Sequence, residues 1–180
     1  MNYQDIIEYW FNTLSPEDWF AKNDTVDQYI HDHFKDVHRA ACQCELSDWR
    51  ESAEGRLAEI IILDQFSRNL FRDDAQAFAA DAQALSLAQE AIRLGGDHSL
   101  SDDNRRAFLY MPYMHSESLR IQDESLRLFS TLDDKNYYNY AVMHRDIIVQ
   151  FGRYPHRNEV IGRSSIQAEI DYLSDGGQTF

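Results

Sequence analysis

The chain has 180 residues, of which 43% are hydrophobic and 13% aromatic, and its formal net charge is −14. This size and composition provide a sizeable core without disulfides or metals, so they exclude a disordered chain and predict one domain over residues 1–180. The acidic surplus argues against nucleic acid and anionic membranes as general partners, although it is compatible with one local basic site.

The cysteines and the apolar runs indicate a cytoplasmic protein. Cys42 and Cys44 are the only cysteines, and their i,i+2 spacing on one expected helix points the two thiols apart. Unpaired thiols are typical of a reducing compartment, and the acidic N-terminal stretch lacks the pattern of a signal peptide. The longest aliphatic run, Ile60–Leu63, is far shorter than the ~20 residues of a membrane-spanning helix. We therefore expect no membrane partner, and the oligomeric state stays open.

Apolar residues recur with a helical period along the chain, and no stretch alternates between apolar and polar residues as a strand does. The pattern predicts an all-α protein of about eight helices in antiparallel hairpins. In chain order the expected helices are Tyr3–Asn12, a short one from Pro16, one from Asp24 to about Leu46, Ala53–Asn69, Asp81–Leu94, one after Ser101 that includes Leu109, Glu117–Leu132, Tyr137–Phe151, and a last one through Ile170 and Leu173.

Polar residues, glycine and proline mark the expected ends of these helices. Glu117 is expected in a first helical turn, where a carboxylate is favourable against the helix dipole. Gly152 is expected to end the helix Tyr137–Phe151 at positive φ, and Pro112 is expected to kink or end its own helix. The expected N-caps are Ser15, Asn23 or Asp24, Ser52, Asp81, Ser101, Ser116, and Ser164 or Ser165.

The stretch His144–Arg163 contains two histidines and four arginines around a glycine and a proline. His144 and Arg145 fall within the broad apolar face of the expected helix, so the guanidinium needs a carboxylate, a carbonyl cluster or a ligand as its partner. Two interpretations stay open. The arginines either cap carbonyls and pair with surface acids, or they form a binding site, for which bidentate carboxylate or phosphate contacts suit arginine.

Asp64 and Arg68 lie four residues apart in the most apolar of the expected helices, so their side chains can form an ion pair. This pair is either a buried and self-contained structural element, or a device in which Asp64 orients Arg68 toward a ligand. The sequence alone is compatible with both.

Common catalytic and cofactor motifs do not occur in the chain. There is no G-x-x-x-x-G-K, G-x-G-x-x-G, H-E-x-x-H or G-x-S-x-G sequence. His31 and His38 share one helix face with Asp27, but exposed helix histidines seldom hold a metal. We therefore expect neither a metal nor a cofactor.

Several polar residues flank the expected helix ends and corners, where binding sites commonly form. The principal hypothesis is a module that binds a small anionic ligand or a peptide carboxylate in an arginine- and histidine-rich pocket between helices. The candidate ligand-binding residues are Asp64, Arg68, Asn69, His115, His144, Arg145, Arg153, Arg157 and Asn158, with His156 beside them.

The first alternative is an enzyme in which His144 or His115 acts as general acid or base, with Asp64 or Glu117 as its partner. It requires an imidazole within hydrogen-bond reach of a carboxylate and open to a pocket. The second alternative is a protein-interaction scaffold whose polar core is purely structural.

Four stretches of the chain carry a resemblance to a known family: SPEDWFAKN, EGRLAEIIILDQFSRNLFR, FLYMPYMHSES and HRDIIVQFGRYPHRNEVIGR. Together they resemble the bacterial family called domain of unknown function nine-twenty-four. The resemblance implies an all-helical fold similar to tetratricopeptide-repeat proteins and no established activity, although the tetratricopeptide sequence pattern itself is absent. Ser67 stands where the family pattern usually has proline. The positions that match the family pattern are Asp64, Gln65, Phe66, Arg68, Asn69, His115, Ser116, Glu117, His144, Arg145, Arg153, Pro155, Arg157 and Asn158.

Overall fold

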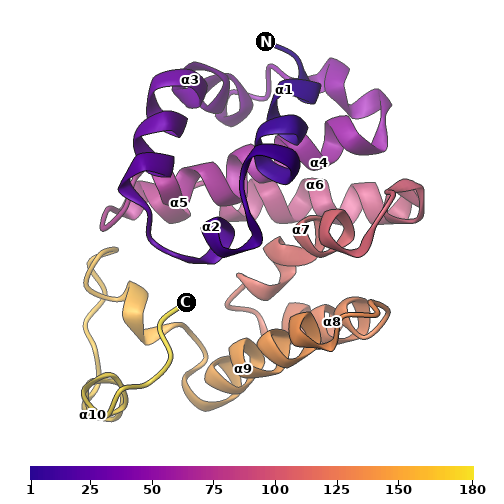
Figure 1. Ribbon diagram of the computed structural model, residues 1–180. Coiled ribbons are helices and arrows are strands. Elements are labelled where there is room, and N and C mark those ends of the chain that lie inside the picture. Colours follow the sequence, from indigo (N-terminus) through magenta and orange to yellow (C-terminus); the bar gives the residue numbers. More distant parts are fainter.

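The computed structural model describes residues Met1–Phe180 and consists of helices without any strand, so the all-α prediction is confirmed (Figure 1). The likeness to tetratricopeptide arrays stays a prediction. A π-helical turn, Ile62–Phe66, joins α4 to α5 without a break, so the ten labelled segments form nine helices. No helix has both the length and the apolar character that a bilayer crossing needs. The bounds are α1 Tyr3–Glu8, α2 Pro16–Phe20, α3 Asp24–Cys42, α4 Ala53–Ile61, α5 Ser67–Leu70, α6 Asp81–Arg93, α7 Asp103–Met114, α8 Leu119–Phe129, α9 Lys135–Phe151 and α10 Gln167–Ser174.

Several predicted helix ends are confirmed by their hydrogen bonds. Ser15 forms a capping box with Asp18 before α2, and the Asn23 and Ser52 side chains accept from backbone N–H groups at the starts of α3 and α4. Gly152 follows α9 with φ of 71°, a conformation in which any other residue would bring its Cβ close to a carbonyl oxygen.

Other predicted ends are wrong by a few residues. Helix α3 ends at Cys42 instead of near Leu46, and Pro112 lies inside α7 without ending it. Glu117 precedes α8 instead of lying in its first turn, so the helix dipole does not explain that carboxylate. The residues in N-cap position are Ala80, Asp102, Ser118 and Ile166, in place of Asp81, Ser101, Ser116, and Ser164 or Ser165.

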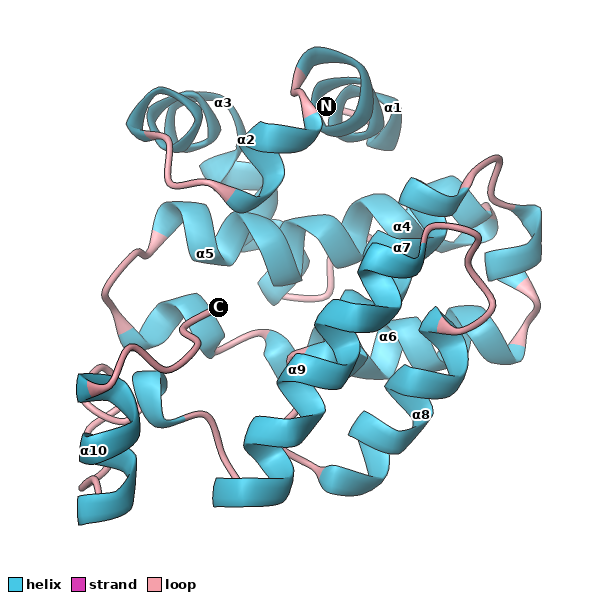
Figure 2. Ribbon diagram, turned by 60° about the horizontal axis from the view of Figure 1, so that its bottom comes forward, coloured by secondary structure: helices cyan, strands magenta, loops and turns pink.

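The apolar helix α4 lies at the centre of the molecule, as its hydrophobic pattern indicates. It contacts α1 on one side and α6 and α7 on the other (Figure 2). A single cluster of 34 buried residues extends from Ile6 to Ala141 around it. The rings of Trp10 and Phe108 meet edge to face there, with centroids 5.4 Å apart, a favourable geometry for aromatic pairs.

The C-terminal segment, residues 152–180, packs beside this core and has a much smaller apolar cluster. Only three buried residues form that cluster: Tyr154 from the segment, and Ile147 and Ile148 from the end of α9. In Figure 1 this yellow segment, which carries α10, lies next to the end of α9. Polar contacts hold much of it: within the segment Arg153 pairs with the buried Glu169, at 2.5 Å. This placement leaves a hollow between the segment and helices α6 and α7.

Candidate functional site

The site begins at Asp64, a carboxylate that is 1% exposed and lies on the π-helical turn between α4 and α5. Such turns widen a helix locally and are frequent at functional sites. The carboxylate accepts hydrogen bonds from Gln65 Nε2 and from His115 Nδ1, at 2.5 and 2.7 Å. Burial alone would raise the pKa of Asp64, but its electrostatic interactions with His115 and Arg68 and these hydrogen bonds hold it well below its ordinary value. Asp64 is therefore an ionised orienting group.

His115 follows α7 and is the histidine that meets the solvent-accessible hollow. Burial lowers the pKa of His115 below its ordinary value, although the charge of Asp64 opposes this shift, so the imidazole is neutral near pH 7. Because Nδ1–H donates to Asp64, the lone pair lies on Nε2, and Nε2 has no hydrogen-bond partner within the protein. This arrangement of carboxylate and imidazole is one in which the free nitrogen can accept a proton.

His144 lies beside His115, with ring centroids 6.2 Å apart, but it is enclosed by the protein. Its Nδ1–H donates to the Tyr140 carbonyl at 2.8 Å, and the ring of Phe180 stacks on it at a centroid distance of 3.5 Å. Burial, with the nearby charge of His115, lowers the pKa of His144 to about 3. Burial therefore keeps His144 in its neutral form, while the Tyr140 carbonyl and the Phe180 ring fix the orientation of its imidazole.

Arg68 contacts two carboxylates, those of Asp64 and Asp81. The Asp64–Arg68 pair is therefore neither a self-contained ion pair nor simply a device that orients Arg68 toward a ligand. Its guanidinium donates to the Asp64 carbonyl and lies 3.5 Å from the Asp64 carboxylate. It also makes a bidentate contact to Asp81, at 3.0 and 3.1 Å. Asp81 accepts in addition from Arg157 Nη1, at 3.3 Å. One carboxylate thus links the central helices to the C-terminal segment.

Arg157 is only 8% exposed and lies between two aromatic rings. Its Cζ atom is 4.6 Å from the ring centroids of both Phe78 and Tyr154, which is cation–π geometry. The contact to Asp81 uses Nη1 alone, while Nε is buried without any partner and Nη2 has none either. A buried guanidinium with unused N–H groups is costly without a ligand to complete its hydrogen bonds.

The corner after α7 is fixed by contacts from two directions. Glu117 accepts from Arg163 at 2.6 and 2.8 Å and from the Tyr154 backbone N–H at 2.8 Å. These contacts hold the pKa of Glu117 below its ordinary value in spite of burial, which would raise it. Fully buried Gln122 donates from Nε2 to the Met114 and Ser116 carbonyls, at 2.8 and 2.7 Å. Hydrogen bonds therefore fix the chain on both sides of His115.

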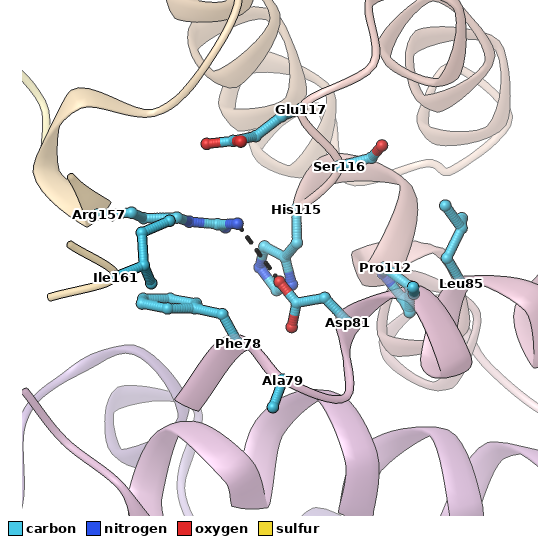
Figure 3. A pocket seen from close by; sticks show the side chains of 11 residues that line it. Phe78, Ala79, Asp81, Leu85, Pro112, His115, Ser116, Glu117, Arg157 and Ile161 are labelled. Atoms are coloured by element: carbon cyan, nitrogen blue, oxygen red, sulfur yellow. Dashed lines mark hydrogen bonds and ion pairs between the residues drawn. The ribbon is translucent and has the colours of Figure 1, made fainter. Parts of the chain in front are cut away.

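These groups surround a hollow of about 340 Å³ between the start of α6, the end of α7 and the C-terminal segment (Figure 3). That volume is at the small end of the range for small-molecule sites. The hollow is lined by Phe78, Ala79, Asp81, Ala82, Leu85, Pro112, His115, Ser116, Glu117, Arg157 and Ile161.

The structure brings six of the predicted site residues together at or directly behind this hollow: Asp64, Arg68, His115, Glu117, His144 and Arg157. Four others lie elsewhere. Asn69 donates to Asp27 at 2.7 Å in the contact between α5 and α3. Arg145 pairs with Asp123 at 2.7 Å, so it has the expected carboxylate partner, but that partner is exposed and lies outside the hollow.

Arg153 and Asn158 brace the C-terminal segment from within. Arg153 pairs with Glu169 and donates to the Ser164 carbonyl, at 3.0 Å. Asn158 is fully buried and donates to Glu169 at 3.1 Å while it accepts from Arg163 at 2.9 Å. Neither residue lines the hollow.

Four important residues were not among the sequence candidates: Phe78, Asp81, Gln122 and Tyr154. Asp81 looked like a helix cap, and nothing in the local sequence indicates that it meets arginines 13 and 76 positions away. Tyr154 immediately precedes Pro155 in the arginine-rich stretch, and this position could have indicated it as a site candidate. Its buried hydroxyl donates to the Met114 carbonyl at 2.6 Å and so ties the C-terminal segment to α7.

The comparisons with known proteins agree with this fold. The model of the family described as "Bacterial protein of unknown function (DUF924)" matches residues 6–177. The chain belongs to this family. A solved structure of a protein of unknown function from Agrobacterium tumefaciens is 40% identical, with a TM-score of 0.92 over 97% of each chain. No curated protein matches the chain. For this DUF924 protein, evidence on function therefore comes from the hollow itself.

Proposed function

We propose that this DUF924 protein binds a small carboxylate-bearing or other anionic molecule in the hollow beside Arg157. The observation that carries the proposal is the incomplete hydrogen bonding of that guanidinium, which is buried in the wall with Nε and Nη2 unpartnered. The paired N–H groups of an arginine guanidinium match carboxylate and phosphate oxygens in geometry and charge. An anion in the hollow would supply the missing acceptors.

The charges around the hollow support an anion at this arginine. Each acid there already has a cation of its own, since Asp81 takes the bidentate contact of Arg68 and Glu117 takes that of Arg163. Burial lowers the pKa of Arg157 below its ordinary value, whereas the pKa of Arg68 is raised, so the charge of Arg157 is the less stabilised of these two. A negative ligand would favour its charged form.

Replacement of Arg157 by glutamine is expected to weaken binding of acetate or phosphate roughly 30-fold, because a charge-assisted hydrogen bond of about 2 kcal/mol is lost. Isothermal titration calorimetry on the full chain measures this loss. Arg145→Gln is the matched control, since Arg145 lies outside the hollow and should leave affinity unchanged. The proposal fails if the unmodified protein binds none of these anions, or if both variants bind equally well.

A second candidate function, hydrolysis, is favoured by the Asp64–His115 pair. The neutral imidazole has its free Nε2 at the hollow and its Nδ1–H on a buried carboxylate, as a general base requires. In this reaction Nε2 would take a proton from water while the resulting hydroxide adds to an ester carbonyl. The C–O bond then breaks and the leaving alkoxide takes up a proton. His144 and Glu117 are less suited, because a backbone carbonyl and an arginine occupy them.

His115→Asn is expected to lower hydrolysis of p-nitrophenyl esters on the order of 100-fold, the usual contribution of a positioned base. Because the pKa of His115 lies below its ordinary value, the base form persists as pH falls from about 7 and is lost only in acid. The rate should therefore stay flat through the neutral range. The exposed His98, changed to Gln, is the control. Equal rates in all three proteins would rule out catalysis by His115.

We also propose that residues 1–180 act as one domain and that the protein is cytoplasmic. The first point rests on the apolar cluster that extends from α1 to α9. The second rests on Cys42 and Cys44, whose thiols are both free. The Cys42 Sγ atom lies 3.8 Å from the His38 ring nitrogens, and neither cysteine forms a disulfide.

A further inference from the structure

The hollow has two chemically different ends, one on each side of His115 (Figure 3). Arg157 and its aromatic neighbour Phe78 form one end. Leu85 of α6 and Pro112 of α7 form the other, and in Figure 3 they lie across His115 from the guanidinium. A ligand that spans the hollow would therefore place its anionic group and its apolar group on opposite sides of this imidazole.

The far end offers no polar group to a ligand. Leu85 is half-buried and packs against the main core, and Ala82 is its neighbour one turn earlier on the same helix face. Proline has no backbone N–H, so Pro112 presents only its ring carbons there. Such a surface is stabilised by contact with an apolar group.

The middle of the hollow can hydrogen-bond a neutral linking group. His115 Nε2 is an acceptor without a donor. Ser116 also lines the hollow; its Oγ accepts from the Ser118 N–H at 3.2 Å, and its hydroxyl hydrogen has no acceptor in the protein. One acceptor and one donor match the N–H and the carbonyl of an amide.

The same walls disfavour a strongly charged ligand. The carboxylates of Asp81 and Glu117 line the hollow together with Arg157. A dianion such as phosphate would lie near both acids, whereas one carboxylate can occupy the free edge of the guanidinium. The site is therefore suited to a ligand with a single negative charge and an otherwise neutral body.

We propose that the ligand is a small N-acylated amino acid, with its carboxylate on Arg157, its amide across His115 and its apolar acyl chain on Leu85 and Pro112. This inference rests on the proposed function and names the ligand class of the same site. It adds the requirement for an apolar group at a fixed position relative to the charge, which simple anion binding does not include.

The test is calorimetric titration of the full chain with acetate, phosphate, N-acetylglycine, N-hexanoylglycine and the neutral N-hexanoylglycinamide. Each buried methylene is worth roughly threefold in affinity, so the hexanoyl compound should bind at least about tenfold more tightly than the acetyl compound. The neutral amide should bind far more weakly than its acid, because it offers Arg157 no charge.

Leu85→Ser should remove most of the gain from the longer acyl chain and leave the affinity for acetate unchanged. The matched control is Leu87→Ser, on the same helix and likewise half-buried against the core but outside the hollow. If acetate binds through Arg157 but the hexanoyl chain adds nothing, the ligand class is wrong and anion binding stands. If none of the anions binds, the proposed function itself fails.

Discussion

Acidification from about pH 6.5 to about pH 4.5 is expected to lower the free energy of unfolding by up to about 2.7 kcal/mol per pH unit from two histidines alone. Burial, with the charge of His115, lowers the pKa of His144 to about 3. Burial, with the charge of Arg157, lowers the pKa of His156 to about 4, and both His156 ring nitrogens lack partners. Below the ordinary value of 6.5, the unfolded chain takes up protons that the folded chain does not. Stability is therefore lost as pH falls.

Urea unfolding followed by circular dichroism at several pH values in this window measures the slope. The carboxylates with depressed pKa values, such as Asp64, act in the same direction but mostly below this window, so the histidines dominate within it. His144→Phe should reduce the slope by about 1.4 kcal/mol per pH unit, because one proton fewer is taken up on unfolding. His98→Gln is the matched control, since that imidazole is exposed. A flat profile would mean that the histidines are not buried in their neutral form.

Truncation of Asp64 to alanine is expected to destabilise the fold by roughly 3 to 5 kcal/mol, the usual cost when one partner of a buried ionic group is removed. The change leaves the His115 Nδ1–H without an acceptor and takes one of two carboxylates from Arg68. The Asp64 carboxylate is only 1% exposed, so water cannot readily replace the lost oxygen atoms.

Asp123→Ala is the matched control for this experiment, because Asp123 also pairs with an arginine but is 57% exposed. Exposed pairs contribute at most about 1 kcal/mol, so this variant should unfold nearly like the original protein. Asp64→Asn, which keeps one acceptor oxygen, should fall between the two. Equal stability of the two alanine variants would show that the Asp64 cluster contributes no more than a surface ion pair.

The helices were predictable because their signals are local. The period of the apolar residues located α4 and placed it at the centre, and Ser15, Ser52 and Gly152 marked ends that their own hydrogen bonds or dihedral angles determine. One error arose where two adjacent polar residues, Ser101 and Asp102, could each cap a helix. Asp102 accepts from the Arg105 N–H, whereas the neighbouring Ser101 donates to Asp102.

The site was predictable only in part because its residues are joined by long-range packing. The sequence indicates His115 as a polar residue at a corner and Asp64 as one on an apolar helix, but their 2.7 Å contact spans 51 positions of the chain. Arg145 and Arg157 looked alike in sequence. Their environments differ because α9 turns Arg145 toward α8 and solvent, while the turn after Gly152 brings Arg157 back onto Asp81.

The small apolar cluster under the C-terminal segment bears on how a ligand reaches the hollow. With three buried residues against 34 in the main core, this segment should open in fluctuations that leave the rest folded. Its backbone amides should then exchange with deuterium faster than those of α4. A molecule bound between Arg157 and α6 would stabilise the closed position of the segment and slow that exchange. The same opening of the segment would therefore admit the ligand and expose the amides.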